Sequence, residues 1–471
     1  MLEATSIQAQ LAGARGDRLR VLVVGAGVAG TTVAQLLRRE GLHPVLVERS
    51  AREADSGYML ALMPLVDPVL DTLGVPERYL ADSVGLDRYR FRNPAGTTLG
   101  EYSLAGLFER FGDYRGISRG ELLGVLGSAG GAVTYGTTVT ALGRRPAAVA
   151  ATLDDGAAPV EAEFDLVVAA DGLHSPTRGL VLDPGRVATY DTGWGGWVAW
   201  AEPDQDVDLS EELWGVGVFV GTYPVKDRLG VIVAGPRSDT EAGTERFVAG
   251  VRRRSGSVGP RIGRALDAVA RSPDAYYWSL TDCRSDTWSV GRVALLGDAA
   301  AGFLPTAGIG AAMAMESAWV LGSLLADATP DGVPRRPRSL RGGPAAQGGG
   351  RPGQLPPAGP PDVLPQQGPV RAAQHRGPVH PPGDGPAPHH QAAPGAAPRQ
   401  VRRYDAPLRS TMAPVRYSAP GLARKTTTRA TSSGVAARLS GLWARMASPA
   451  GPWRNGAAMS VSTKPGATVV T

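Results

Sequence analysis

Short, continuous apolar runs separated by helix-like stretches dominate the first 330 residues of the chain. The runs within 21–24, 44–47, 164–170 and 293–296 have the length and composition of strands that are buried on both faces. Helical stretches follow two of these runs, one ending near Arg39 and one beginning after Gly310. Strands that alternate with helices predict an α/β fold built on a parallel sheet, so we expect a Rossmann-like domain.

A second pattern, in which apolar and polar positions alternate, occupies the middle of the chain. Arg88–Ser103 is typical of a hairpin around Asn93–Gly96, and Val187–Pro236 of several short strands. Thr240–Arg271 has a helical pattern interrupted by Gly and Pro. We therefore predict a mostly antiparallel substrate domain at 181–284. It is inserted into a domain made of 19–180 and 285–330, of which 55–117 contributes to the substrate side.

Neither pattern continues beyond about residue 330. Residues 331–471 carry 23 of the 39 prolines and no Ile, Phe or Glu, so they cannot bury enough apolar surface to offset their ordering entropy. The whole chain has three lysines against 46 arginines, which indicates a GC-rich gene. Because GC-rich DNA read out of frame yields mostly Arg, Pro, Ala and Gly, we interpret 331–471 as a frameshifted segment. A genuine Pro/Arg/Gly-rich disordered tail is the alternative.

The charge of the chain changes at the same place. Residues 1–330 hold 30 basic and 40 acidic side chains, whereas residues 331–471 hold 19 basic and 4 acidic ones. The part expected to fold is therefore acidic, which disfavours a nucleic-acid partner. A single cysteine, Cys283, excludes a disulfide framework, and no ligand spacing indicates a metal site. The first residues contain no signal-like apolar block. We expect a disordered segment at 1–18, no integral membrane segment, and a cytoplasmic location.

The first apolar run opens a dinucleotide-binding pattern. Gly25, Gly27 and Gly30 follow the run at 21–24 with the spacing GxGxxG, and a helix follows them. This spacing allows a tight turn, a close approach of the backbone to a pyrophosphate, and close packing of helix on strand. Glu48, followed by Arg49, ends the next apolar run, where a carboxylate can accept from an adenosine ribose hydroxyl. The pattern predicts a dinucleotide without distinguishing NAD from FAD.

Two later segments narrow this prediction. Asp171-Gly172 begins a DGxxSxxR pattern that ends at Arg178, and Gly297-Asp298 begins a GDxxxxxxPxxGxG pattern with Pro305, Gly308 and Gly310. Three such motifs in this order resemble the class A flavoprotein monooxygenases, the p-hydroxybenzoate hydroxylase family. The resemblance covers residues 20 to about 326.

The resemblance implies a role for each matched position. Asp298 would accept from a ribityl hydroxyl of FAD, and the turn of Pro305, Gly308 and Gly310 would face the isoalloxazine. Amides at the start of the following helix would meet the N1–C2 edge, where the reduced flavin carries negative charge. Asp171, Gly172, Arg178 and Arg119 match positions near the pyrophosphate and the path of NAD(P)H.

The sequence departs from the family pattern in three places. Ala301 stands where many members carry His, and Glu316-Ser317 where Asp-Ala is common. Neither change removes a group that the chemistry requires, because the flavin itself activates oxygen. The third departure is that the segment after about 330 replaces the helices that would close the substrate side.

The substrate pocket is expected between the inserted sheet and the flavin. Tyr58 and Met59 are candidates because the family's chain passes the flavin at this point, and Trp197 is a candidate together with Trp194 and Trp200. Alternate tryptophans in a strand are also typical of ordinary packing.

The resemblance implies an FAD-dependent monooxygenase that consumes NADPH or NADH and inserts one atom of O2 into a small organic substrate. We expect an enzyme of secondary metabolism. No second nucleotide fold is predicted, so NAD(P)H would bind transiently. Three alternatives stay open: a flavin-dependent halogenase, a polyprenyl reductase of the same fold, and a non-catalytic flavin-binding remnant. The segment Trp197-Val-Ala-Trp200 lacks the WxWxIP pattern that halogenases favour.

Overall fold

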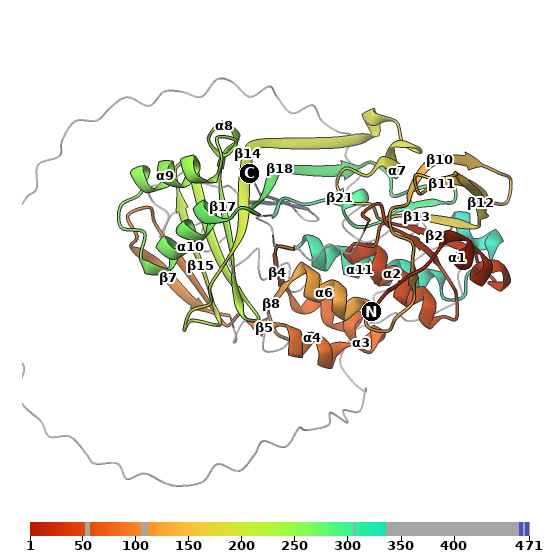
Figure 1. Ribbon diagram of the computed structural model, residues 1–471, viewed down its shortest axis with the longest axis horizontal. Helices are drawn as coiled ribbons and strands as arrows, with labels where there is room; N and C mark the ends of the chain where they lie inside the picture. Colours follow the sequence, from red (N-terminus) through yellow and green to blue (C-terminus); the bar gives the residue numbers. More distant parts are fainter. Residues whose placement is uncertain (52–56, 105–111, 306–307, 336–460, 465–466, 471) are drawn as a thin grey trace, which may run out of the picture. The chain divides into compact units, whose positions relative to one another are not determined.

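The structure, a computed structural model, describes residues 1–51, 57–104, 112–305, 308–335, 461–464 and 467–470. Its fold is mixed α/β, as the sequence predicts, with a parallel sheet and a long, mostly antiparallel sheet (Figure 1). The expected disordered or frameshifted tail lies almost entirely outside the described residues. Near the C-terminus the structure describes a two-stranded hairpin, β22 (Val461–Lys464) with β23 (Ala467–Val470).

The parallel sheet carries the first apolar runs in the order β19-β20-β13-β2-β3. β2, β3, β13 and β20 run parallel, and β19 pairs antiparallel at one edge. The central strands are buried on both faces, which explains why their sequences are continuously apolar. The strands are β2 (Val21–Val24), β3 (Val45–Val47), β13 (Leu166–Ala169), β19 (Ser289–Val290) and β20 (Val293–Leu295).

Two helices pack over this sheet. α2 (Val28–Arg39) follows β2 and is buried from Ala29 to Leu37, because α11 (Gly310–Leu325) packs against its other side. The contact is close at Gly322, where an added Cβ would lie 3.0 Å from Leu36 Cβ. The predicted helices after Gly27 and Gly310 are confirmed.

The inserted sheet has the order β21-β18-β14-β17-β16-β15-β6-β7. The hairpin predicted around Asn93–Gly96 is β6 with β7, and the alternating segment forms β14 to β17. The strands are β6 (Arg88–Arg92), β7 (Thr98–Ser103), β14 (Val187–Ala201), β15 (Leu209–Gly215), β16 (Val218–Val225), β17 (Arg228–Pro236), β18 (Tyr276–Ser285) and β21 (Ala301–Gly302).

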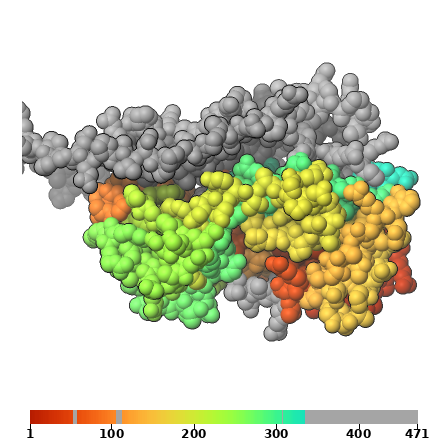
Figure 2. All heavy atoms as spheres, turned by 90° about the horizontal axis from the view of Figure 1, so that it is seen from above, coloured from red at the N-terminus to blue at the C-terminus, as the bar shows by residue number. Residues whose placement is uncertain are grey.

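Helices cover one face of this long sheet. α8 (Arg237–Thr240), α9 (Thr244–Arg254) and α10 (Pro260–Arg271) lie on that face, which we call the helix face. Phe247, Ile262 and Leu266 pack there against Val220 and Val233. The opposite face meets β4 (Met59–Leu62) and β8 (Arg115–Ser118), on the side of α11 (Figure 1). In the space-filling view the later strands of the sheet and its helices form a compact mass of green atoms (Figure 2).

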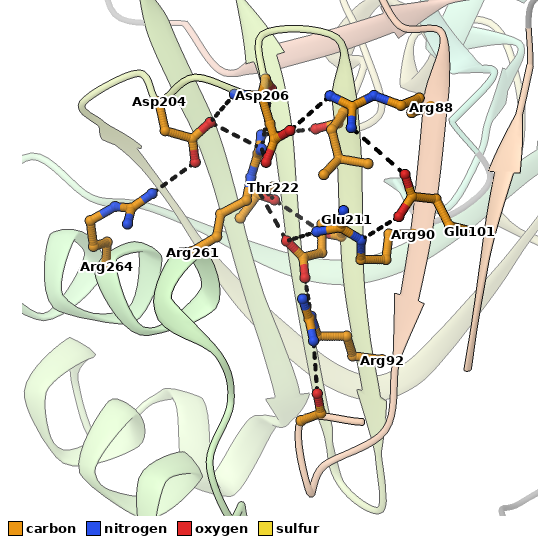
Figure 3. A network of polar contacts seen from close by, with 12 residues as sticks. Arg88, Arg90, Arg92, Glu101, Asp204, Asp206, Glu211, Thr222, Arg261 and Arg264 are labelled. Atoms are coloured by element: carbon orange, nitrogen blue, oxygen red, sulfur yellow. Dashed lines mark hydrogen bonds and ion pairs between the residues drawn. The ribbon is translucent and has the colours of Figure 1, made fainter. Parts of the chain in front are cut away.

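A network of ion pairs fixes the helix face to α10 (Figure 3). Arg261 Nη1 lies 3.0 Å from Asp204 Oδ1, and its Nη2 donates to the Leu209 carbonyl at 2.8 Å. Arg264 also pairs with Asp204, at 2.8 Å. Glu211, buried on β15, accepts from Arg92. The network therefore joins β6, β15 and α10, which are far apart in the sequence.

The remaining described strands form smaller sheets. β4, β5 (Val84–Gly85) and β8 form a small antiparallel sheet, and β10 (Thr138–Arg144), β11 (Val149–Asp154) and β12 (Val160–Phe164) form another. β1 (Glu3–Ala4) pairs parallel with β9 (Ala132–Val133). The other helices are α1 (Ile7–Gly13), α3 (Asp67–Leu73), α4 (Pro76–Asp82), α6 (Arg119–Leu126) and α7 (Pro176–Gly179).

The expectation of disorder at 1–18 is wrong. Ser6 caps α1, and Ile7 is buried. The Gln10 amide donates to the Leu46 carbonyl at 2.9 Å and accepts from the Leu46 amide at 2.9 Å, so it completes the hydrogen bonding at the edge strand β3. The first residues are ordered because they cover an edge that would otherwise expose unpaired backbone groups.

The domain boundary at 330 also falls too early. A short 3-10 helix spans Pro330–Arg335, and Val333 is fully buried in the core of the parallel sheet. Arg292 holds this segment by donating to the Pro330 carbonyl at 2.7 Å.

No helix among the described residues is long and apolar enough to cross a membrane. The described residues likewise contain no group of His, Cys, Asp and Glu side chains arranged to bind a metal ion.

Candidate functional site

The turn between β2 and α2 needs glycine at two places. Gly25 has a φ of +100°, and an added Cβ would lie 2.6 Å from the Ala170 carbonyl oxygen. A Cβ at Gly30 would overlap the carbonyl oxygen of Gly25. Both glycines therefore serve the fold itself, through the left-handed turn and the close contact of helix with turn.

Gly27 differs because protein atoms leave it free space. An added Cβ would meet one described atom within 4 Å, the guanidinium Nη2 of Arg119 at 4.0 Å. Gly27 is the N-cap residue of α2, no side chain of a described residue caps this end, and the first turn contains no acidic residue. The positive end of α2 and the Arg119 guanidinium thus lie together beside an open backbone, which suits a phosphate group.

Glu48 turns back toward the same loop. Its Oε2 accepts from the Ala26 amide at 2.8 Å, and its Oε1 accepts from the Ser50 amide at 2.9 Å. Each carboxylate oxygen keeps a further lone pair for a ligand hydroxyl. Arg49, the next residue, has an exposed side chain.

The DGxxSxxR segment acts mainly within the protein. Asp171 accepts from the Ser175 hydroxyl and, at 3.0 Å, from the Thr177 amide. Arg178 donates to the Leu173 carbonyl at 2.8 Å and to the Ala299 carbonyl at 2.9 Å. Gly172 takes a positive φ of +85° in this turn. The segment therefore links the end of β13 to the Gly297–Asp298 turn.

Gly297 brings that turn close to both helices. Its φ is +57°, and an added Cβ would lie 2.8 Å from Ala29 Cβ and 3.4 Å from Ala314 Cβ. The adjacent Asp298 side chain is open to solvent, yet the surrounding protein raises its pKa by desolvation. A carboxylate that is both accessible and closely surrounded by protein lies in a concave part of the surface.

The start of α11 adds a third group of donors. Pro305 and Gly308 form a turn in which the Gly308 amide donates to the Pro305 carbonyl at 3.0 Å, and Gly308 has a φ of +61°. α11 begins at Gly310, and no side chain of a described residue caps it. Its first amide groups are available to a ligand.

This set of groups is compatible with FAD. Two uncapped helix ends and the Arg119 guanidinium offer donors and positive potential, as a pyrophosphate and the N1–C2 edge of a flavin require. Glu48 and Asp298 offer carboxylate acceptors for hydroxyl groups, and the space at Gly27 permits close approach of a ligand to the backbone.

Tyr58 connects these groups with the long sheet. Its carbonyl accepts from the Arg119 amide at 2.9 Å, and its hydroxyl hydrogen-bonds to the Arg119 side chain. Burial is the main cause that raises the pKa of Tyr58, so the hydroxyl keeps its proton. The Tyr58 ring meets the Trp278 ring edge-on, with centroids 4.4 Å apart.

Met59 lies directly over the long sheet. An added Cβ at Gly230 would collide with Met59 Cβ at 2.5 Å, so the missing side chain at Gly230 is what admits Met59. Aromatic rings, most of them half-buried, surround this point on the face opposite α9 and α10. We call this surface the aromatic face, formed by Trp194, Trp214, Phe219, Tyr223 and Trp278 with Tyr58 and Met59.

Trp197 does not belong to the aromatic face. Its indole Nε1 donates to the Thr240 carbonyl at 2.9 Å, and its ring packs on Tyr277 on the helix face. The expectation that Trp197 lines the pocket is therefore wrong, because side chains alternate between the faces of a strand. Trp194 lies on the aromatic face, and Trp200 carries the Arg228 guanidinium 4.4 Å above its ring.

Sequence reasoning missed Trp278 and Tyr223. Both lie at positions where alternating strand residues include aromatic side chains, Tyr276–Trp278 on β18 and Phe219–Tyr223 on β16. The alternation indicates that these strands have two distinct faces, but it does not indicate which face the helices cover.

The fold and site together define a flavoprotein in which a Rossmann-like half adjoins an aromatic sheet. A comparison of sequences gives the same class. The profile of the FAD binding domain family matches residues 18–334. The chain belongs to this family, and it is an FAD-dependent monooxygenase, as the resemblance implied.

Relatives and solved structures agree with this assignment. The chain is 30% identical over 351 residues to 3-amino-4-hydroxybenzoate 2-monooxygenase PtmB3 of Streptomyces platensis, covering 69% of this chain and 84% of the relative. It is 33% identical over 329 residues to the 3-amino-4-hydroxybenzoate 2-monooxygenase of Streptomyces cremeus, covering 67% of this chain and 80% of the relative. Klebsiella pneumoniae HpxO, solved with FAD and uric acid, shares the fold with a TM-score of 0.58 at 23% identity, over 70% of this chain and 89% of HpxO.

Proposed function

We propose that this protein hydroxylates an electron-rich, hydroxyl- or amino-substituted aromatic compound, with NADPH or NADH as the electron donor. The balanced reaction consumes the substrate, O2, NAD(P)H and a proton, and yields the hydroxylated product, NAD(P)⁺ and water. FAD, when bound, supplies the redox chemistry with NAD(P)H and O2. The enzyme would act in the cytoplasm, where both nicotinamide cofactors are available, and a place in secondary metabolism accords with the named relatives.

The protein groups supply binding and orientation. Arg119 and the start of α2 at Gly27 would hold the pyrophosphate, with Gly25 and Gly30 shaping the turn. Glu48 and Asp298 would accept from the ribose and ribityl hydroxyls. The turn of Pro305 and Gly308 and the amides after Gly310 would meet the flavin edge, where their positive potential favours the reduced flavin.

One observation supports the aromatic substrate most directly, the position of Tyr58. It contacts Arg119 on the cofactor side, while its ring packs against Trp278 of the aromatic face. The proposed cofactor site and a half-buried aromatic surface are thus joined through a single residue. Planar aromatic ligands bind such surfaces through large apolar contact and edge or offset stacking. The names of the two Streptomyces relatives, aminohydroxybenzoate monooxygenases, point to the same substrate class.

The proposal assigns the domains by these roles. Residues 19–180 and 285–335 carry the cofactor groups, 181–284 supply most of the aromatic face, and 57–104 contribute Tyr58 and Met59. Asp171, Gly172, Arg178 and Gly297 hold the shape of the cofactor site, whereas Arg49 has no assigned contact.

A turnover assay tests the proposal. The purified protein, loaded with FAD, is mixed with NADPH or NADH, isotope-labelled O2 and 3-amino-4-hydroxybenzoate or a related aminophenol. We expect substrate-stimulated oxidation of the nicotinamide and a product that has gained one labelled oxygen atom. Stimulated oxidation that yields only hydrogen peroxide with every aromatic tried would contradict the hydroxylase function, and turnover without O2 would favour a reductase.

A further inference from the structure

Two neighbouring glutamates of β15 point to opposite faces of the long sheet. Glu211 and Glu212 are both buried, with 1% and 4% of their surface exposed. Glu211 lies on the helix face within the arginine network (Figure 3). Glu212 lies on the other side, and its hydrogen-bond partners are residues of the aromatic face and its β6 neighbour.

Glu212 accepts three hydrogen bonds from neutral donors. The hydroxyls of Tyr89 and Tyr223 both donate to its Oε1, and the indole Nε1 of Trp214 donates to its Oε2 at 2.7 Å. Burial raises the pKa of Glu212 above its ordinary value, while the three hydrogen bonds act in the opposite direction. Burial and the neighbouring carboxylate raise the pKa of both tyrosines, so their hydroxyls remain protonated.

The direction of these hydrogen bonds determines whether the tyrosine hydroxyls offer a ligand a donor or an acceptor. A tyrosine hydroxyl has one hydrogen, and in Tyr89 and Tyr223 that hydrogen is committed to Glu212. The hydroxyl oxygens are left with lone pairs alone, so toward a ligand they act as acceptors. A ligand group that meets them must donate, as a phenolic hydroxyl or an aromatic amine does, whereas a carboxylate offers acceptors only.

The cluster belongs to the same surface as the proposed substrate site. Tyr223 pairs across the sheet with Gly230, the residue that Met59 covers. Met59 follows Tyr58, which contacts Arg119. Tyr89, Trp214 and Tyr223 are half-buried and not fully covered by protein. Tyr223 and Trp214 therefore belong to the surface that Tyr58 connects to the cofactor groups.

We propose that Glu212 is a specificity-determining residue, which fixes Tyr89 and Tyr223 as acceptors so that the aromatic face selects ligands carrying a hydrogen-bond donor on the ring. This inference deepens the proposed function, since it names the substituent by which the substrate is recognised. It acts through the two tyrosines, so Glu212 is a positioning residue.

The test compares ligands of equal shape. Binding of para-cresol, para-xylene and para-toluate to the FAD-loaded protein is followed by quenching of tryptophan fluorescence. Para-cresol and para-xylene differ by a hydroxyl against a methyl group of similar size. We expect para-cresol to bind roughly three- to tenfold more tightly than para-xylene, the effect of one neutral hydrogen bond, and para-toluate to bind most weakly.

The variant Glu212→Gln should change these relative affinities. Trp214 requires an acceptor, so the glutamine oxygen faces it and the glutamine amide donates to the tyrosines, which frees their hydroxyls to donate outward. Para-toluate should then gain affinity, and the preference for para-cresol should shrink by about the same factor. Tyr223→Phe should lower the preference for para-cresol without any gain for para-toluate.

The matched control is Glu211→Gln, one residue away on the helix face. It should lower the thermal stability but leave the order of the three ligands unchanged. Unaltered relative affinities for the three ligands in a folded, FAD-containing Glu212→Gln protein would overturn the proposal, as would equal binding of para-cresol and para-xylene to the wild type. These measurements need neither NAD(P)H nor turnover, so their failure is distinguishable from failure of the hydroxylase activity.

Discussion

Gly27 and Gly30 lie three residues apart in the same turn, and their surroundings differ. A Cβ at Gly30 would overlap the Gly25 carbonyl oxygen, whereas a Cβ at Gly27 would meet a described protein atom no closer than 4.0 Å. At the residue scale, Gly30 is needed by the fold. Gly27 has no such steric requirement, and its proposed role is to admit the cofactor.

This difference yields a paired prediction. Gly27→Ala should leave the stability of the FAD-free protein nearly unchanged and weaken FAD binding by about tenfold or more, equivalent to about 1.4 kcal/mol. Gly30→Ala should destabilise the protein itself by about 1–3 kcal/mol through overpacking. Thermal melting of the FAD-free protein and FAD titration measure the two effects. If Gly27→Ala lowered the free energy of unfolding of the FAD-free protein as much as the free energy of FAD binding, the proposed role of Gly27 in cofactor binding would be wrong.

Asp67 is a second residue whose surroundings determine its properties. Burial at the start of α3, with Asp71 and Asp113 nearby, raises the pKa of its carboxyl to about 7, and Arg115 counteracts this only in part. A folded-state pKa above the unfolded value of about 3.9 means that ionisation opposes folding. This residue therefore lowers stability progressively as the pH rises from about 4 to about 7, and the loss persists above that.

Asp67→Asn should remove this cost. We expect the variant to be more stable than the wild type at pH 8 by about 1–2 kcal/mol, a value reduced for partial solvent access. The difference should disappear below about pH 3, where the wild-type carboxyl is protonated in both states. Denaturant unfolding at the two pH values measures it. A stability difference independent of pH would show that the effect comes from packing.

At the scale of elements, α10 is attached to the long sheet through charges as well as apolar contacts. Arg261 and Arg264 both pair with Asp204, but the Arg261 side chain is 7% exposed and that of Arg264 is 55% exposed. Arg261 also donates to the Leu209 carbonyl on β15 and to Thr222 on β16, so it holds these two neighbouring strands in place under the helix (Figure 3).

The two arginines should therefore differ in their contribution to stability. Arg261→Met leaves buried acceptors without a partner and should cost about 3–5 kcal/mol. Arg264→Met removes an exposed ion pair and should cost less than about 1 kcal/mol. Denaturant unfolding in low and high salt compares them, and the Arg264 effect should shrink in salt. If both variants lost a similar free energy of unfolding, the buried ion pairs of Arg261 would contribute no more to stability than the exposed pair of Arg264.

At the scale of the whole molecule, the chain divides where its composition changes. The family match ends at residue 334, close to the point where proline and arginine become abundant.

The coding DNA should therefore contain a second open frame beyond about codon 335. We expect that frame to encode amphipathic segments with ordinary Leu and Glu content, which sequencing and translation of all frames will reveal. Restoring it should raise the melting temperature and the FAD affinity of the expressed protein. A second frame interrupted by stop codons would contradict this interpretation and favour a genuine Pro/Arg-rich segment.

Much of the cofactor half was predictable from local sequence. Strands buried on both faces are continuously apolar, and the glycine spacing of a phosphate-binding turn is a local requirement, so β2, α2 and the turn between them were recognisable. The order at residues 3–16 was not, because it depends on Gln10 reaching Leu46, a contact distant in sequence. Val333 was missed for the same reason, since its burial comes from the sheet that it covers.

The sequence by itself determined the α/β class, the three flavin motifs and the existence of an alternating sheet, because each depends on neighbours within one strand or turn. Only the tertiary structure decided which side of that sheet each residue occupies. Trp194 and Trp197 are three residues apart on β14, so their side chains point to opposite faces, and the helices packed on one side make the face of Trp197 the helix face and leave Trp194 on the aromatic face. The same rule separates Glu211 from Glu212. Alternation fixes that neighbours point apart, but packing over the sheet decides which of them meets the substrate side.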